Sequence, residues 1–307
     1  MQTWHSNGKL LLTGEYLVLD GAKALALPVN KGQSLRVEEI SHTDRKILRW
    51  KALIPQGTWF ESVYSLPDLS ILSRSNEPAA KKLQTLLRAC RNWNTEFLKA
   101  DKSFQVTTVL DFPPDYGWGS SSTLVSNLAS WADVDPFVLQ RSVLGGSAYD
   151  IACTRNNHPL FYQLQNGHPV VEPAHFQPAF GDRLYFLHLE NKQNTEESIL
   201  DFRKTGRYND SLIRKISEIT ETLTETKTLH EFETLLEEHE HLMAEVLNQQ
   251  PVKQKLFADY PGTIKSLGAW GGDFVLITRR GSEEEMKNYL SQKGYSTLFS
   301  WDSLLIL

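Results

Sequence analysis

The sequence predicts an α+β fold, in which strand-forming and helix-forming segments are mixed along the chain. Short apolar runs separated by turn residues occupy residues 8–40, which is typical of strands. Helical spacing of apolar residues follows over residues 78–98 and returns over residues 210–249. A glycine loop, a strand, a helix and a strand are expected to close the chain. This order of elements is compatible with α+β.

The N-terminal half is expected to begin with strands. Leu10–Leu12 and Tyr16–Leu19 are short apolar runs, and the turn signal Asp20-Gly21 follows them. Further strands are expected at residues 24–29 and 34–37. The remaining elements of this half are a helix over residues 78–98, a strand over 104–110 and a helix over 124–132.

The C-terminal half is expected to follow a boundary in the polar, proline-containing segment of residues 166–181. Residues 185–189 predict a strand. Residues 210–249 predict helix, with the charged residues on a solvated face. The last expected elements are a strand, a helix and a strand at residues 274–278, 282–293 and 296–299.

The composition excludes several classes of protein. Of the 307 residues, 40% are hydrophobic and 22% charged, and the net charge is −5. This balance argues against nucleic-acid binding through a broad basic face. No apolar run reaches the ~18 residues of a membrane span, and the N-terminal residues lack a secretory pattern. The two cysteines, Cys90 and Cys153, are expected to be buried thiols. The sequence therefore predicts a cytoplasmic protein without nucleic-acid or membrane partners.

The stretch Pro114–Thr123 contains glycines and serines just before a helix-like segment. Glycine lets a backbone approach a ligand closely, and the N–H groups at a helix start favour an anion. Alone, the stretch fits either a phosphate cradle or a capped turn. The residues that would hold phosphate are Gly117, Gly119, Ser120, Ser121 and Ser122.

Three further motifs accompany this loop in a fixed order. They are Gly8–Gly21, Gly145–Ala152 and the glycine-rich stretch Lys265–Phe274. Together the four motifs resemble those of the GHMP kinases, the family of galactokinase, homoserine kinase, mevalonate kinase and phosphomevalonate kinase. The resemblance spans residues 8–274.

The resemblance implies a two-domain fold and two cofactors. The N-terminal domain, residues 1–175, would resemble domain 2 of ribosomal protein S5 and bind ATP. The C-terminal domain, residues 176–307, would be ferredoxin-like. ATP and Mg²⁺ are the implied cofactors, with Ser121 as the metal ligand and Ser120 as the next candidate. The implied partner is a small-molecule substrate, and a homodimer is left open.

The resemblance also assigns a catalytic pair and an acceptor site. Asp150 would orient or deprotonate the substrate hydroxyl, and Lys9 would neutralise charge beside it. Locally, Asp150 also fits a turn residue and Lys9 a surface lysine. The implied substrate-binding residues are Glu15, Tyr16, Ser147, Gly268, Gly271 and Gly272.

The chain departs from the family pattern at several positions. Asn7 replaces a proline, and Trp118 replaces a leucine and either stacks on the nucleotide or fills the core. A metal-binding glutamate expected near Gln140 is missing, which leaves Mg²⁺ to serine and phosphates or to a water held by Gln140. Asp273 stands at the end of the last glycine motif.

The N-terminal segment resembles mevalonate and phosphomevalonate kinases more than galactokinases, and mevalonate is the first predicted acceptor. Phosphomevalonate is the second and would need several cations, for which Arg74, Lys81, Lys82 and Arg155 are available. A catalytically lapsed relative that binds a nucleotide or metabolite is the alternative. A zinc hydrolase is excluded at Glu237–His241, because the residue four after His239 is Met243.

Overall fold

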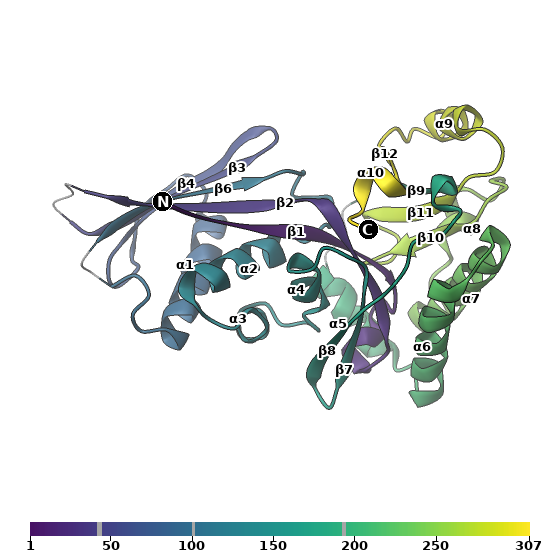
Figure 1. Cartoon of the computed structure of the whole chain (residues 1–307), viewed down its shortest axis with the longest axis horizontal. Coiled ribbons are helices and arrows are strands. Elements are labelled where there is room, and N and C mark those ends of the chain that lie inside the picture. The colour runs from purple at the N-terminus through teal and green to yellow at the C-terminus, as the bar shows by residue number, and fades with distance from the viewer. Residues whose placement is uncertain (42–44, 100–101, 192–194) are drawn as a thin grey trace. The chain divides into compact units, whose positions relative to one another are not determined.

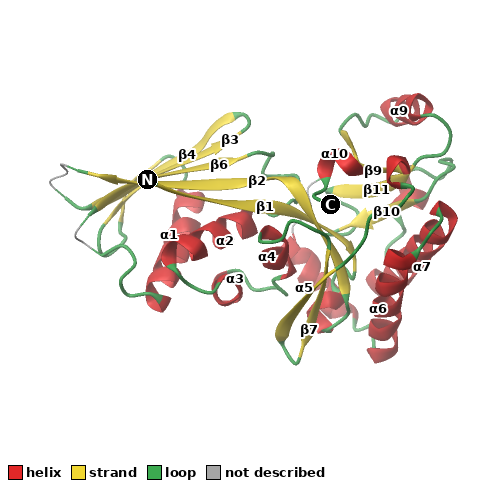
Figure 2. Cartoon of the chain, in the orientation of Figure 1, coloured by secondary structure: helices red, strands yellow, loops and turns green. Residues whose placement is uncertain are grey.

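The computed structural model describes residues 1–41, 45–99, 102–191 and 195–307. Helices and strands are mixed along the chain, which confirms the α+β prediction (Figures 1 and 2). The chain divides into two compact units made of interleaved segments. The first unit comprises residues 1–8, 31–114 and 118–155, and the second comprises residues 9–30, 115–117 and 156–307. The expected domain boundary after residue 175 stays a prediction.

The first unit is built on a sheet with the strand order β5-β4-β3-β6-β2. Its strands are residues 31–40 of β2 (Ala24–Ile40), together with β3 (Ile47–Ile54), β4 (Gly57–Ser65), β5 (Ile71–Arg74) and β6 (Ser103–Leu110). The hairpin of β3 and β4 is antiparallel, and β3 runs parallel to β6. Along β3, the buried side chains of Leu48, Trp50 and Ala52 alternate with exposed ones, so one face of the strand meets the core. β1 (Gln2–Thr13) pairs with β2.

Helices supply the rest of this core. They are α1 (Glu77–Trp93), α2 (Ser120–Ala132), α3 (Pro136–Val143) and α4 (Tyr149–Thr154). Leu87 of α1, Leu128 of α2 and Ile151 of α4 belong to the same buried cluster as Leu48. α1 ends before the predicted residue 98, because Asn94 is extended and its side-chain amide donates to the Ala132 carbonyl at 2.7 Å.

The second unit contains a four-stranded antiparallel sheet in the order β10-β11-β9-β12. Its strands are β9 (Leu184–His188), β10 (Ile264–Leu267), β11 (Phe274–Thr278) and β12 (Leu298–Ser300). Helices connect β9 to β10 and β11 to β12, so the chain follows the β-α-β-β-α-β order of ferredoxin-like domains. The predicted ferredoxin-like C-terminal fold is thereby confirmed.

The remaining elements of the second unit surround this sheet or pair with β2. The helices are α5 (Thr195–Thr205), α6 (Asp210–Glu225), α7 (Leu229–Leu247), α8 (Val252–Leu256), α9 (Glu283–Gln292) and α10 (Trp301–Leu304). The strands β7 (Leu160–Gln165) and β8 (His168–Pro173) form a hairpin, in which β7 pairs with residues 24–26 of β2. The short helices η1 (Leu17–Asp20) and η2 (Gly181–Arg183) complete the unit.

Two local expectations are wrong. Residues 16–19 do not form a strand, because the chain turns sharply at Tyr16 and continues as η1. The charged residues within 210–249 do not all face solvent, since Glu233 and Glu240 of α7 are buried. They lie on the same face as the apolar stripe of that helix and pack into the unit.

Candidate functional site

The turn before α2 leaves the start of that helix open. Gly119 is the N-cap residue with φ 84°, and no side chain caps the helix. The Ser122 hydroxyl donates to the Gly119 carbonyl at 2.9 Å, so it serves the turn itself. Ser121 is exposed and Ser120 half-buried. The first turn of α2 therefore presents uncapped N–H groups and two serine hydroxyls, the features that bind an anion.

Lys9 and Gly117, both predicted site residues, lie together in the second unit. The Lys9 Nζ donates to the Gly117 carbonyl at 2.9 Å. Gly117 has φ 67°, and a Cβ placed on it would lie 2.1 Å from the Asp273 Oδ2. A side chain at Gly117 would be strained by the positive φ and would force the Asp273 carboxylate to move, so the position favours glycine.

Trp118 is a core residue of the first unit. Its side chain is 1% exposed, and its ring packs edge-on against Phe112 with 5.5 Å between centroids. Of the two roles that the sequence left open for Trp118, the structure shows core packing.

Asp150 occupies the first turn of α4 in the first unit. The preceding Ala148 has φ 65°, and the Ile151 N–H donates to the Asp150 Oδ1 at 3.1 Å. The carboxylate is half-buried, and Ser147 beside it is buried. Asp150 and Lys9 belong to different units, so their predicted pairing stays a prediction.

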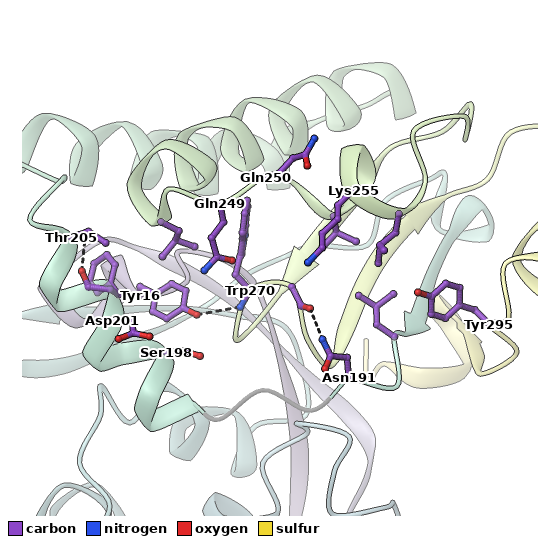
Figure 3. Close-up of a pocket in the computed structure, with 16 residues that line it drawn as sticks. Tyr16, Asn191, Ser198, Asp201, Thr205, Gln249, Gln250, Lys255, Trp270 and Tyr295 are labelled. Carbon is purple, nitrogen blue, oxygen red and sulfur yellow. Dashed lines mark hydrogen bonds between the residues drawn. The ribbon is translucent and has the colours of Figure 1, made fainter.

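The second unit contains a cavity of about 440 Å³ beside Tyr16 (Figure 3). Its walls come from α5, the α7–α8 connection, α8 and the loops after β9 and β10. Among the predicted substrate-binding residues, Tyr16 and Gly271 line it, whereas Glu15, Gly268 and Gly272 do not. The polar lining residues are Asn191, Ser198, Asp201, Thr205, Gln249, Gln250 and Lys255.

Glu15 lies in a buried charge cluster instead of the cavity wall. The Lys265 Nζ donates to the Glu15 Oε1 at 2.5 Å, and both side chains are fully buried. Burial raises the pKa of Glu15 to about 7, although the Lys265 ammonium opposes the shift. Burial also raises the pKa of Glu240, whose Oε2 lies 3.7 Å from the Lys265 Nζ.

The sequence assigns no site role to His239, Glu240 or Lys265, although Lys265 begins the last glycine-rich motif, yet all three surround Glu15. A signal for His239 was present in α7. Phe232, Leu236, Met243 and Val246 are buried at helical spacing, and His239 falls within this stripe. A histidine inside an apolar stripe indicates burial. No periodic signal pointed to Lys265, since its partner lies 250 positions away along the chain.

The described residues contain no group of three or more His, Cys, Asp or Glu side chains arranged to hold a metal ion. Within the same described ranges, no helix is long and apolar enough to span a membrane. Cys90 and Cys153 are both buried, as expected.

No protein-family model and no curated protein sequence matches this chain. Several solved structures are similar to it in fold. Mevalonate kinase from Methanococcus jannaschii has a TM-score of 0.72 at 14% identity, with 100% of this chain and 98% of that chain covered. Streptococcus pneumoniae phosphomevalonate kinase, in complex with phosphomevalonate and AMPPNP, has a TM-score of 0.71 at 15% identity and 98% and 100% coverage.

A third structure widens the comparison beyond the mevalonate branch. Lactococcus lactis galactokinase, complexed with galactose, has a TM-score of 0.66 at 12% identity, with 99% of this chain and 93% of that chain covered. All three are GHMP kinases. The resemblance drawn from the four motifs is confirmed at the level of the fold over the length of the chain: this protein has the GHMP kinase fold.

Proposed function

We propose that the protein is an ATP-dependent kinase that transfers a phosphoryl group to the hydroxyl of a small metabolite, with mevalonate as the acceptor. The observation that carries the proposal is the uncapped start of α2 behind Gly119, within a fold whose similar structures are metabolite kinases. Phosphoryl transfer depends on holding phosphates and neutralising charge, and such a helix start supplies fixed N–H donors for both tasks.

The residues around α2 fit the phosphates of ATP and a hard cation. Gly117 and Gly119 have positive φ, which lets their backbone approach an anion closely. The exposed Ser121 hydroxyl is an oxygen ligand of the kind that Mg²⁺ prefers. ATP would supply the transferred phosphoryl group and Mg²⁺ would neutralise its charge.

Asp150 and Lys9 are proposed to act on the reacting groups. Asp150 would accept the proton of the acceptor hydroxyl as its oxygen attacks phosphorus. Lys9 would stabilise negative charge on the transferred group. The position of Lys9 supports this role, since its ammonium already contacts the backbone of Gly117 in the phosphate loop.

The charges of the cavity favour an acceptor with one negative group. Lys255 is exposed and forms no ion pair within the described part of the chain. Asp201, the acidic lining residue, is paired with Lys204 at 2.9 Å. The Lys255 ammonium is complementary to the single carboxylate of mevalonate. Galactose has no negatively charged group for it to bind.

Three of the four basic residues named for a phosphorylated acceptor, all but Lys82, make contacts elsewhere. Arg74 and Lys81 both pair with Glu77, at 3.3 and 2.8 Å. The Arg155 guanidinium donates to the Ser130 hydroxyl at 2.7 Å. These contacts favour mevalonate over phosphomevalonate, which remains the second candidate.

The test is ADP release with ATP and Mg²⁺ against mevalonate, phosphomevalonate, homoserine and galactose. We expect turnover with mevalonate, and a loss of about two to four orders of magnitude in the Asp150→Ala variant. Turnover with a different acceptor would replace mevalonate. ATP binding without turnover on any acceptor would favour a lapsed, ligand-binding relative, and near-normal turnover of Asp150→Ala would remove Asp150 from the mechanism.

A further inference from the structure

The chain makes a strained turn at Tyr16, at the edge of the cavity. Tyr16 has φ 60° and ψ −50°. The Leu17 N–H donates to the Glu15 carbonyl at 2.7 Å, which closes a three-residue γ-turn around Tyr16. A γ-turn with positive φ at its centre is rare and strained, especially for a bulky residue. Such a turn persists only where its surroundings hold it in place.

Lys265 holds the residue before Tyr16. Its Nζ donates to the Glu15 Oε1 at 2.5 Å and to the Ser266 carbonyl at 2.7 Å. Glu240 holds Ser266 in turn, because its carboxylate accepts a hydrogen bond from the Ser266 hydroxyl at 2.7 Å. The Glu15 side chain is thereby tied to β10 and α7 with no access to water. Removal of Lys265 would leave two acidic groups buried together.

His239 holds the backbone at Gly14, the residue before Glu15. The Gly14 N–H donates to the His239 Nε2 at 3.1 Å, so this nitrogen carries a lone pair. Burial and the nearby Lys265 charge lower the pKa of His239 well below its usual value, which keeps the imidazole neutral. The Glu15 Oε2 lies 3.3 Å from the same nitrogen, and this contact is therefore not an ion pair. The histidine acts as a buried hydrogen-bond acceptor for the turn.

The turn directs the Tyr16 side chain toward Trp270 and α5. The backbone N–H of Trp270 donates to the Tyr16 hydroxyl at 3.2 Å, and the Tyr16 ring stacks on Phe202 with 5.2 Å between centroids. Tyr16, Phe202 and Trp270 all line the cavity (Figure 3). The conformation of the turn thus decides the shape of one cavity wall.

We propose that Lys265 and His239 are positioning residues that hold the strained Glu15–Leu17 turn and, through it, the Tyr16 wall of the cavity. They act from α7 and β10, on a turn more than 200 positions earlier in the chain. The consequence for acceptor binding rests on the proposed kinase function. The consequence for the turn does not, since it concerns hydrogen bonds within one unit.

The first experiment is hydrogen exchange of the full chain, followed by mass spectrometry of peptides that cover residues 12–22. In His239→Leu the Gly14 N–H loses its acceptor, and we expect exchange of this segment to accelerate by about tenfold or more. His239→Gln places a side-chain oxygen near the former Nε2 and should restore most of the protection. Arg280→Met is the matched control, because it breaks a different ion pair with α7, to the buried Glu233. It should leave this segment unchanged.

Lys265→Met tests the charge cluster in the same way. Because it leaves Glu15 and Glu240 without their cation, this variant can fail to fold. The double variant Glu15→Gln/Lys265→Met removes a buried charge of each sign and is the second test. Faster exchange of residues 12–22 in the folded double variant is expected. Exchange equal to the wild type in this variant and in His239→Leu would overturn the proposal.

The kinetic readout separates positioning from general loss of structure. We expect His239→Leu to raise the acceptor KM by about tenfold, with kcat and the KM for ATP within about twofold. Two results would overturn the link to the cavity. One is an equal rise in the KM for the acceptor and the KM for ATP. The other is an unchanged KM for the acceptor in a variant whose residues 12–22 exchange faster. If the wild type phosphorylates no acceptor, the proposed function fails, and the exchange data still decide whether the two residues hold the turn.

Discussion

At the scale of single residues, Glu15 shows how surroundings set chemistry. It stands in a glycine-flanked motif at the end of β1, where the sequence implied a role in acceptor binding. In the structure the carboxyl group is fully buried against Lys265. Burial is the largest cause of its raised pKa, and the nearby Glu240 charge adds to it, while the Lys265 ammonium lowers it. Glu15 therefore titrates near neutral pH.

This titration predicts a pH-dependent stability. The pKa of Glu15 is about 7 in the folded chain and about 4.5 when exposed, so the folded state binds this proton more tightly. The free energy of unfolding should therefore fall as the pH rises from about 4.5 to about 7, and level off above. Glu15→Gln should flatten this part of the profile in denaturant unfolding. If Glu15→Gln keeps the wild-type dependence of stability on pH, this dependence does not come from Glu15. Glu240 and Lys265 are present in both proteins and would then have to account for it.

At the scale of elements, the connection into α2 depends on glycines for two different reasons. Gly119 provides the left-handed N-cap conformation. Gly117 provides that conformation and also leaves room for the Asp273 carboxylate. The carbonyl of Gly117 also accepts a hydrogen bond from the Lys9 ammonium. A side chain at Gly117 should disturb the loop and the position of Lys9 together.

Gly117→Ala should lower the free energy of unfolding by about 1–3 kcal/mol more than Gly167→Ala does. Gly167 is the matched control, since its φ is 76° and a Cβ there would meet nothing within 4 Å. Denaturant unfolding measures the loss in free energy of unfolding for both variants. Asp273→Gly should recover part of the stability of Gly117→Ala by removing the obstructing carboxylate. Equal costs for the two alanine variants would show that the Asp273 contact is unimportant.

At the scale of the whole molecule, sequence neighbours are divided between two units. Residues 115–117 belong to the second unit, and the residues on either side of them belong to the first. The connection into α2 is therefore divided in this way, with Gly117 counted in one unit and Gly119 to Ser122 in the other. Nucleotide binding at the start of α2 should stabilise the folded chain, because a ligand that binds only the folded state shifts the unfolding equilibrium toward it.

ATP with Mg²⁺ is expected to raise the free energy of unfolding by about 2.7 kcal/mol at a concentration of 100 Kd. Thermal unfolding with and without the nucleotide measures this effect as a rise of several degrees in Tm. Ser121→Ala should reduce the part of the rise that requires Mg²⁺ and keep the part due to ATP alone. An unchanged Tm at saturating ATP would contradict nucleotide binding at α2.

Much of the element order could be predicted, because it depends on local signals. The start of α2 follows from its glycines and serines, and the strand at residues 274–278 follows from its apolar run. Other elements were missed. The hairpin of β3 and β4 is one of them, although its residues alternate between buried and exposed. The apolar run of residues 16–19 predicts a strand, but it hides the turn at Tyr16.

The sequence by itself determined the order of the four motifs, the open helix start at Ser120 and, through them, the GHMP kinase fold. These features depend on residues close together in the chain, where glycine conformation and helix ends act locally. Only the tertiary structure decided that Glu15, His239 and Lys265 are buried together and that Tyr16 sits in a strained turn. A buried charge persists only beside its partners, and those partners come from α7 and β10, which short-range sequence patterns do not connect.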